Sequence, residues 1–277
     1  MSTELGWGRQ LLMCPPTHYD VTYAINPWMD LSADVDRDRA QRQWEELVST
    51  LRAAGAEVEL LDVDPALPDL VFTANLGVVA GRTFVPARMR HLERRPEALH
   101  AEAWFGAHGF DVRPLRETVV QEGAGDALPF ADTLVAGYGP RSHADAYVEL
   151  GQIVGGPILP ITLVDARFYH LDIVFCPLDS DAALLSPDAI DPADLERVEE
   201  LVADVIALTG EEAAAFCANS VAVGRTVVMP ACTARLEREL RARGFEPVVV
   251  DMSEFLKSGG GPRCLTLALD VPSRATR

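Results

Sequence analysis

Short apolar runs recur along the whole chain, and this recurrence limits the possible folds more than any other feature. Most runs are bounded by Gly, Pro or Asp, which is typical of buried strands that end in turns. They include RQLLMC, EVELLDV, LVFTANLGVVAG, RTFVPA, TLVAG, LPITLV, DIVFCPL, DAALLSP, SVAVGRTVVMP, EPVVVDM and CLTLALD. Between some of them, apolar residues recur at the three-to-four-residue spacing of a helix. Strands that alternate with helices predict an α/β protein.

The helical stretches have recognisable starts and stops. One stretch predicts a helix from Asp191 to just before Gly210, and Ser142 is the expected cap of another. Two further stretches share one layout of helix, glycine and strand, namely QRQWEELVSTLRAAGAEVELLDV and TARLERELRARGFEPVVVDM. This shared layout predicts a repeated strand–helix–strand unit.

Length and charge narrow the class of protein. No Ser/Gly-rich linker or charge block divides the 277 residues, so we predict a single domain over 1–277. The 42 acidic and 24 basic residues give a formal net charge of −18, which argues against nucleic acid or an anionic membrane as a partner. The same charge favours a small cationic substrate. A homo-oligomer is compatible with the sequence, and a start without a signal-peptide pattern predicts a cytoplasmic protein.

Cys264 is the candidate nucleophile among five cysteines. The five are odd in number, widely spaced and free of CxxC pairs, which disfavours a disulfide framework or a zinc site. Cys264 follows the segment GGGPR, and such a glycine-rich turn lets the backbone approach a ligand closely. A nucleophilic thiol needs this access and a nearby cation or N–H group. The segment alone is also compatible with a buried cysteine at the start of a core strand.

A nucleophilic cysteine needs a group that transfers protons. His170 differs from the other five histidines because it enters an apolar run, two residues before Asp172, in ARFYHLDIVFCPLD. Strand alternation would place His170 and Asp172 on one face. The other histidines lie in polar or helical surroundings and are expected at the surface. An isolated H-x-D pattern is also found at ordinary strand edges.

Two further segments contain polar residues in unusual places. Glu122 and Asp126 flank a Gly-Ala-Gly turn in VVQEGAGDALPF, which fits either turn chemistry or a cation site. Asp69 precedes an apparent strand that contains Phe72 and Asn75. A buried amide without a partner is unfavourable, so Asn75 is expected to have a partner or a function. Each feature taken singly also fits an ordinary structural role.

Taken together and in this order, the motifs resemble the guanidine-modifying enzymes of the pentein, or amidinotransferase–dimethylargininase, superfamily. The resemblance covers essentially the whole chain, and LLMCPPTHYDVTYAINPWMD and VFTAN are similar to the arginine dihydrolase branch. It implies a five-bladed α/β propeller of ββαβ-type modules around a pseudo-fivefold axis, with the active site in the central channel.

The resemblance also implies roles for individual residues. Cys264 would attack the guanidinium carbon, His170 would act as general acid and base, and Glu122 would orient His170. Further positions would bind the substrate or support its binding site, namely Asp69, Phe72, Asn75, Asp126, Asp172, Arg141, Arg94 and Asn26. Paired carboxylates suit a planar guanidinium cation because they accept its N–H groups and keep it charged. Neither a cofactor nor a metal is implied.

Asn75 is the residue that favours one branch. Deiminases and many dimethylaminohydrolases have aspartate here, whereas arginine dihydrolases resemble this chain in having asparagine. An amide carries no charge and offers two N–H donors, so it suits a neutral ureido group or a second water. The sequence therefore predicts arginine dihydrolase activity, through a thiouronium intermediate, to ornithine, ammonia and carbon dioxide.

Several alternatives remain open at this point. One is a dimethylarginine dimethylaminohydrolase, which forms citrulline and an alkylamine. Others are an amidino-group hydrolase or transferase with another substrate, and a catalytically silent ligand-binding protein. A metal-dependent ureohydrolase is disfavoured, because the single HLD lacks the clustered His and Asp ligands that such a site needs.

Overall fold

A computed structural model describes residues 4–273, which form five three-stranded sheets and six α-helices. In every sheet the middle strand has one antiparallel and one parallel neighbour. The sheets are β15 (Leu267–Ala268), β1 (Gln10–Met13) and β2 (Glu57–Leu60); β3 (Gly77–Ala80), β4 (Thr83–Pro86) and β5 (Asp111–Val112); β6 (Ala127–Phe130), β7 (Thr133–Tyr138) and β8 (Ile158–Thr162); β9 (Phe175–Pro177), β10 (Ala182–Leu185) and β11 (Asp204–Ala207); and β12 (Val221–Val223), β13 (Thr226–Met229) and β14 (Glu246–Val249).

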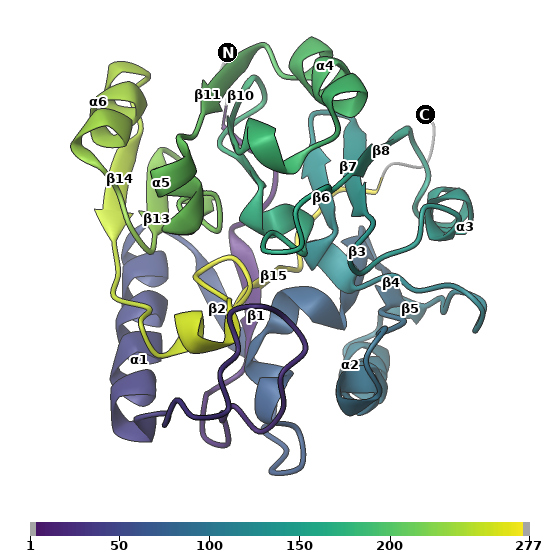
Figure 1. Cartoon of the computed structure of the whole chain (residues 1–277). Helices are drawn as coiled ribbons and strands as arrows, with labels where there is room; N and C mark the ends of the chain where they lie inside the picture. Colours follow the sequence, from purple (N-terminus) through teal and green to yellow (C-terminus); the bar gives the residue numbers. More distant parts are fainter. Residues whose placement is uncertain (1–3, 274–277) are drawn as a thin grey trace.

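One helix joins the middle strand of each sheet to its parallel neighbour, as a parallel pair requires. These helices are α1 (Arg37–Ala53), α2 (Arg95–Ala107), α3 (Ala146–Val154), α4 (Pro192–Leu201) and α6 (Ala234–Ala242). Figure 1 shows them around the outside of the molecule, with β1 and β15 near its middle. The expectations of an α/β fold and of a repeated strand–helix–strand unit are confirmed. The first unit contains strands from both ends of the chain, since β15 pairs with β1.

Two expectations about helices were wrong. The helix that begins after Asp191 ends at Leu201, and the next residues form β11 on the edge of β10. Gly210 does not follow a helix but begins the short α5 (Gly210–Ala214). Ser142 does not cap α3, because its hydroxyl donates to Asp126 instead. In each case a tertiary partner outweighs the local signal.

The expected strand positions of Asn75, His170 and Asp172 were also wrong. Asn75 lies in a 3₁₀ turn over Thr73–Leu76, and Asp172 lies in another over Leu171–Ile173 that directly follows His170. The strands begin only afterwards, at β3 and β9. Side chains two residues apart do not share a face in a 3₁₀ turn, which has three residues per turn. His170 and Asp172 therefore contact different neighbours.

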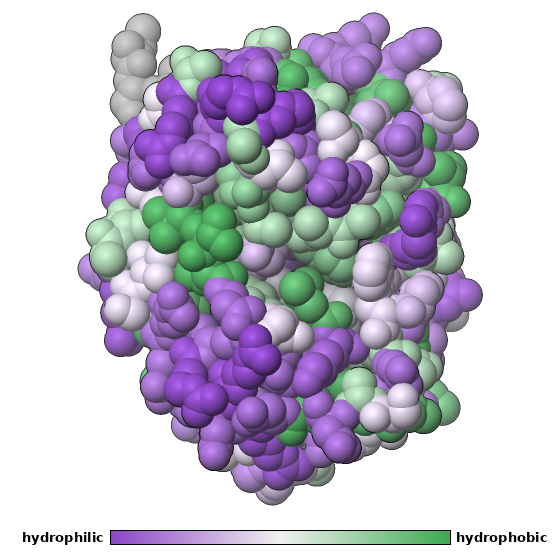
Figure 2. Space-filling view, turned by 60° about the vertical axis from the view of Figure 1, so that its left-hand side comes forward, coloured by the Kyte–Doolittle hydropathy of each residue, from purple (hydrophilic) through white to green (hydrophobic). Residues whose placement is uncertain are grey.

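The surface is mixed in character. Figure 2 shows a face on which hydrophilic residues predominate above and below a middle band with hydrophobic residues. Large exposed apolar side chains belong to several separate elements, including Leu60, Leu99, Val148 and Val249. Single exposed apolar residues of this kind are normal. Within residues 4–273, no helix has both the length and the apolar character needed to cross a membrane.

Candidate active site

The polar residues of the site occupy equivalent places in the five units. Each lies in the segment just before the first strand of a unit: Asn75 before β3, Glu122 before β6, His170 and Asp172 before β9, Asn219 before β12, and Cys264 before β15. The repeated topology thus brings residues that are far apart in sequence to one place. Their hydrogen bonds form two groups, one of Asn75, Glu122 and His170 and one of Asp172, Asn219 and Cys264. The two groups meet at one pocket, which both Asn75 and Cys264 line.

Cys264 is a buried residue in a turn before β15, not a residue within the strand. Its thiol donates to Asp172 Oδ2 at 3.2 Å, and Asn219 Nδ2 donates to its sulfur at 3.1 Å. Asn219 Oδ1 also accepts the backbone N–H groups of Cys264 and Gly261. One amide therefore holds both the turn and the thiol in place.

The charge state of the thiol depends on its surroundings. Burial raises the pKa of the Cys264 thiol well above its ordinary value, and the Asp172 carboxylate raises it further. Burial also raises the pKa of Asp172 to about 7, although the Cys264 hydrogen bond and Arg263 oppose this rise. A cation placed beside these two groups would favour both anionic forms.

His170 is the only buried histidine among the described residues. Its Nε2 lies 2.7 Å from Glu122 Oε2, as the resemblance implied. Glu122 also accepts hydrogen bonds from Arg141 Nη1 at 2.8 Å and from the backbone N–H of Arg90. Burial would raise the pKa of Glu122, but Arg141 and the hydrogen bonds outweigh it and hold this pKa well below its ordinary value. Glu122 is therefore a fixed anion beside the imidazole.

Asn75 connects His170 to an arginine. Its Oδ1 accepts a hydrogen bond from Arg94 Nη1 at 3.0 Å, and its Nδ2 donates to the backbone oxygen of Glu122 at 3.1 Å. Nδ2 also lies 3.5 Å from Nδ1 of His170. There is no room for a side chain at Gly125, where a Cβ atom would lie 2.4 Å from Asn75 Nδ2. The glycine of the EGAGD motif thus makes space for the amide.

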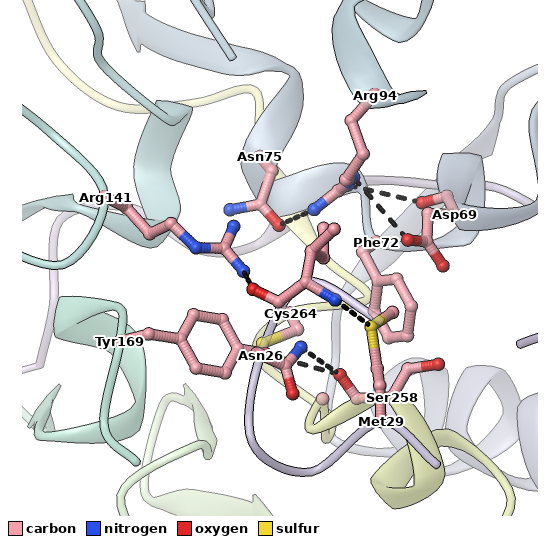
Figure 3. Close-up of a pocket in the computed structure, with 12 residues that line it drawn as sticks. Asn26, Met29, Asp69, Phe72, Asn75, Arg94, Arg141, Tyr169, Ser258 and Cys264 are labelled. Atoms are coloured by element: carbon pink, nitrogen blue, oxygen red, sulfur yellow. Dashed lines mark hydrogen bonds and ion pairs between the residues drawn. The ribbon is translucent and has the colours of Figure 1, made fainter. Parts of the chain in front are cut away.

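A narrow pocket, partly open to solvent, lies next to Cys264. Seven of the predicted residues line it, namely Asn26, Asp69, Phe72, Asn75, Arg94, Arg141 and Cys264. Figure 3 shows Arg94 and Asp69 on one side and Arg141 and Tyr169 on the other. The four remaining predicted residues do not line it but contact the lining residues or one another: Glu122, Asp126, His170 and Asp172.

Two buried carboxylate oxygens near this pocket lack a hydrogen-bond partner within residues 4–273: Asp69 Oδ1 and Asp172 Oδ1. Burial raises the pKa of Asp69 as well, and its other oxygen accepts a hydrogen bond from Tyr23 at 2.8 Å. Unpartnered buried acceptors are rare because they lose the hydrogen bonds of water. Their presence next to a thiol fits a ligand that brings several N–H donors and a positive charge.

The structure adds residues that were missed in the sequence. Asn219 is the most important, and Tyr23, Met29, Tyr169 and Ser258 also contact the site or line the pocket. Asn219 could have been found, since it is an amide within the apolar run FCANSVAV, like Asn75 in its own run. The structure also shows why a glycine is needed in the turn before Cys264. A Cβ atom at Gly260 would lie 2.4 Å from the Phe72 ring.

Within residues 4–273, no group of three or more His, Cys, Asp or Glu side chains has an arrangement that could hold a metal ion. Instead, the Cys264 thiol contacts the Asp172 carboxylate, and the His170 imidazole contacts the Glu122 carboxylate. This arrangement is suited to nucleophilic and acid–base chemistry.

Comparison with known proteins identifies the family. A family profile described as "N,N dimethylarginine dimethylhydrolase, eukaryotic" matches residues 16–270. The chain is 41% identical to an N(G),N(G)-dimethylarginine dimethylaminohydrolase of Mycobacterium tuberculosis over 94% of this chain and 86% of that protein. The chain belongs to the dimethylarginine dimethylaminohydrolase family. The resemblance to guanidine-modifying enzymes is thereby confirmed.

The chain is also similar to arginine dihydrolases. The chain is 40% identical to the bifunctional arginine dihydrolase/ornithine cyclodeaminase AgrE of a Nostoc species, over 96% of this chain but only 38% of AgrE. It therefore spans well under half the length of that bifunctional protein. A solved structure of the N-terminal domain of ArgZ, an arginine dihydrolase bound to its substrate, matches with 37% identity and a TM-score of 0.91. That match covers 95% of this chain and 98% of the ArgZ domain.

Proposed function

We propose that this protein is a cysteine-dependent arginine dihydrolase. One arginine and two water molecules would give ornithine, two ammonia molecules and carbon dioxide. The observation that carries the proposal is the uncharged amide of Asn75, held in a buried site beside His170 in a pocket that also contains Cys264. The identity to AgrE and the ArgZ domain supports the same choice.

Substrate binding would use the free acceptors and donors of the pocket. The guanidinium would lie between Asp69 and Asp172, whose unpartnered oxygens would accept its N–H groups. Arg141 lines the pocket, and among the described residues it donates only to Glu122 and the backbone oxygen of Ile25, so it keeps N–H groups for the substrate carboxylate. Asn26 and Phe72 would complete the walls. Asp126 would support the site through its contacts with Ser142 and Leu171.

The bound cation would activate the nucleophile. In the free protein, burial and Asp172 favour the neutral thiol. A guanidinium beside Asp172 would counter that negative charge and favour the thiolate, and the thiol proton would pass to His170. The thiolate would then form a bond to the guanidinium carbon, and the carbon–nitrogen bond to the leaving ammonia would break.

His170 would move the protons of these steps. It would give a proton to the departing ammonia and then take one from the water that attacks the thiouronium carbon. Glu122 would stabilise the protonated imidazole, because it is a buried anion 2.7 Å from Nε2. After the first hydrolysis the carbon belongs to a neutral ureido group, which the amide of Asn75 could retain by hydrogen bonding for a second attack.

The five similar sheets support a five-bladed propeller around a pseudo-fivefold axis. We propose that one domain over residues 1–277 forms it; residues 1–3 and 274–277 lie outside the described residues. A cytoplasmic location and the absence of nucleic-acid and membrane partners remain predictions.

Dimethylarginine dimethylaminohydrolase activity is the second candidate, favoured by the family profile and the mycobacterial relative.

A substrate comparison tests the proposal. The protein is incubated separately with arginine, asymmetric dimethylarginine and agmatine, with and without EDTA, and the products are identified. We expect ornithine and ammonia from arginine, with the same rate in EDTA. Citrulline and dimethylamine from dimethylarginine, without ornithine from arginine, would establish the second candidate instead.

The value of kcat/KM for arginine is expected to fall as the pH is lowered through about 7. Burial places the pKa of Asp172 at about 7, so below this pH the side chain gains a proton and loses its charge. A neutral Asp172 accepts fewer N–H groups of the cation and attracts it less. A pH profile from about 5 to 9 measures this, since kcat/KM reports groups of the free enzyme. A kcat/KM that stays constant down to pH 5 would contradict the role of Asp172.

Replacing Asn75 with aspartate is expected to change the main product from ornithine to citrulline. The new carboxylate would face the backbone oxygen of Glu122, which the amide now contacts as a donor at 3.1 Å. It would lose the donors for a neutral ureido group and would not retain this group for a second attack. Product analysis by mass spectrometry measures the change. An unchanged ornithine yield in the Asn75→Asp variant would contradict the role of the amide.

A further inference from the structure

Arg94 belongs to a buried ion pair that none of the roles above uses. Its Nε and Nη2 donate to the two oxygens of Glu97 at 2.9 and 2.8 Å, and both side chains are almost completely buried. Glu97 is a residue of α2 and does not line the pocket. Its carboxylate accepts two parallel hydrogen bonds from the guanidinium, a bidentate geometry that restricts the orientation of the arginine.

The remaining donors of Arg94 are also largely in use. Nη2 reaches the backbone oxygen of Asp69 at 3.4 Å, and Nη1 donates to Asn75 Oδ1 at 3.0 Å. A guanidinium has five N–H groups, so these contacts leave one for a ligand. Arg94 is thus less available to a substrate carboxylate than the sequence suggested, and its main contacts are with the protein.

Arg94 and the Glu122 backbone oxygen together fix which way the Asn75 amide faces. An arginine side chain can only donate hydrogen bonds, so the atom of Asn75 that it contacts must be the oxygen. The NH₂ group must then face the other side, towards the Glu122 backbone oxygen and His170 Nδ1. The Nδ1 atom of His170 thus faces the amide, and its Nε2 atom faces Glu122 Oε2.

We propose that Glu97 is a positioning residue that controls the release of the second ammonia. It fixes Arg94, and Arg94 helps to fix the Asn75 amide, which donates one N–H group to the Glu122 backbone oxygen and keeps the other for the ureido group. This inference rests on the proposed dihydrolase function. Arg94 Nε also lies 3.9 Å from Asp69 Oδ2, so Glu97 influences guanidinium binding as well, and the ratio of citrulline to ornithine isolates its effect on the second step.

The variant Glu97→Gln tests the proposal. Glutamine has the same shape, but its NH₂ group meets an N–H donor of Arg94 in place of an acceptor, which frees the guanidinium to move. The matched control is Glu212→Gln, because Glu212 is a similarly buried partner of an arginine, Arg235, and none of its hydrogen bonds is to a site residue. Ornithine, citrulline and arginine are quantified from the initial rate to complete conversion.

We expect the ratio of citrulline to ornithine to rise about tenfold in Glu97→Gln, as a misplaced catalytic group would produce. Arginine consumption should also fall, because Arg94 lies 3.9 Å from Asp69, whereas Glu212→Gln should retain the wild-type ratio. A wild-type ratio in Glu97→Gln would overturn the proposal, whether or not consumption falls, because a merely structural loss lowers both products together.

A second variant covers the case in which Glu97→Gln does not fold. Glu97→Asp keeps the charge but is one methylene shorter, so its carboxylate cannot hold Arg94 in the same place, and the ratio is expected to rise in the same direction. An unchanged ratio in Glu97→Asp would also overturn the proposal. Failure of the dihydrolase function is distinguishable from both results, since the wild-type protein itself would then form no ornithine, and the proposal would fall with that function.

Discussion

Replacing Cys264 with serine is expected to lower arginine turnover on the order of 10⁴-fold or more. The serine hydroxyl is a far weaker nucleophile, because it remains protonated where a thiol can ionise next to a bound cation. Serine still fits the turn, since it can donate to Asp172 and accept from Asn219 as the thiol does. Arginine binding, measured by calorimetry, should therefore persist while ornithine formation is lost.

Cys217→Ser is the matched control for this loss. Cys217 is also a buried thiol, but it donates to the backbone oxygen of Ala231 and does not line the pocket. This variant should keep turnover close to that of the wild-type protein. Full turnover in Cys264→Ser would mean that a different group attacks the substrate.

Replacing His170 with alanine is expected to lower kcat by about 10²- to 10⁴-fold, the usual contribution of general acid–base catalysis. The leaving ammonia would then depart without a proton donor, and the water that attacks the thiouronium would lack a base. The protein should accumulate a covalent adduct on Cys264 if the second of these steps slows more than the first. Rapid acid quenching followed by mass spectrometry of the intact protein measures this adduct.

His100→Ala is the control for the histidine. His100 is a partly exposed residue of α2 whose ring contacts the backbone oxygen of Asp62. Its replacement should leave kcat unchanged. A His170→Ala variant with the kcat of the wild-type protein would contradict the acid–base assignment, even if KM rises.

The sequence contained enough information for the architecture of the chain. Apolar runs bounded by glycine and proline coincide with strands in all five sheets, and α1 ends before Gly55 as its pattern predicts. The strands β5, β6 and β11 were missed. All three are edge strands, and they are stabilised by pairing with the middle strand of their sheet more than by local sequence. The same dependence on a neighbouring strand explains why the helix after Asp191 is shorter than predicted.

The residue types of the site were predictable, whereas their contacts were not. The spacing of His170 and Asp172 indicated one shared face, but the 3₁₀ turn directs one side chain to Glu122 and the other to Cys264. Glu97 illustrates the limit most clearly. In the sequence it is an acidic residue in the first turn of a helix, a common position for a solvent-exposed charge. Glu97 is buried because it pairs with Arg94 and because α2 packs over it, and neither contact can be predicted from the local sequence.

The fate of the guanidino carbon tests the central proposal most directly. Arginine labelled at this carbon is incubated with the protein, and the label and the ammonia released per arginine are both measured. A dihydrolase should release the label as carbon dioxide, with two ammonia molecules and one ornithine for each arginine consumed. Label retained in citrulline, with one ammonia per arginine, would contradict the account and show that the reaction stops after the first hydrolysis.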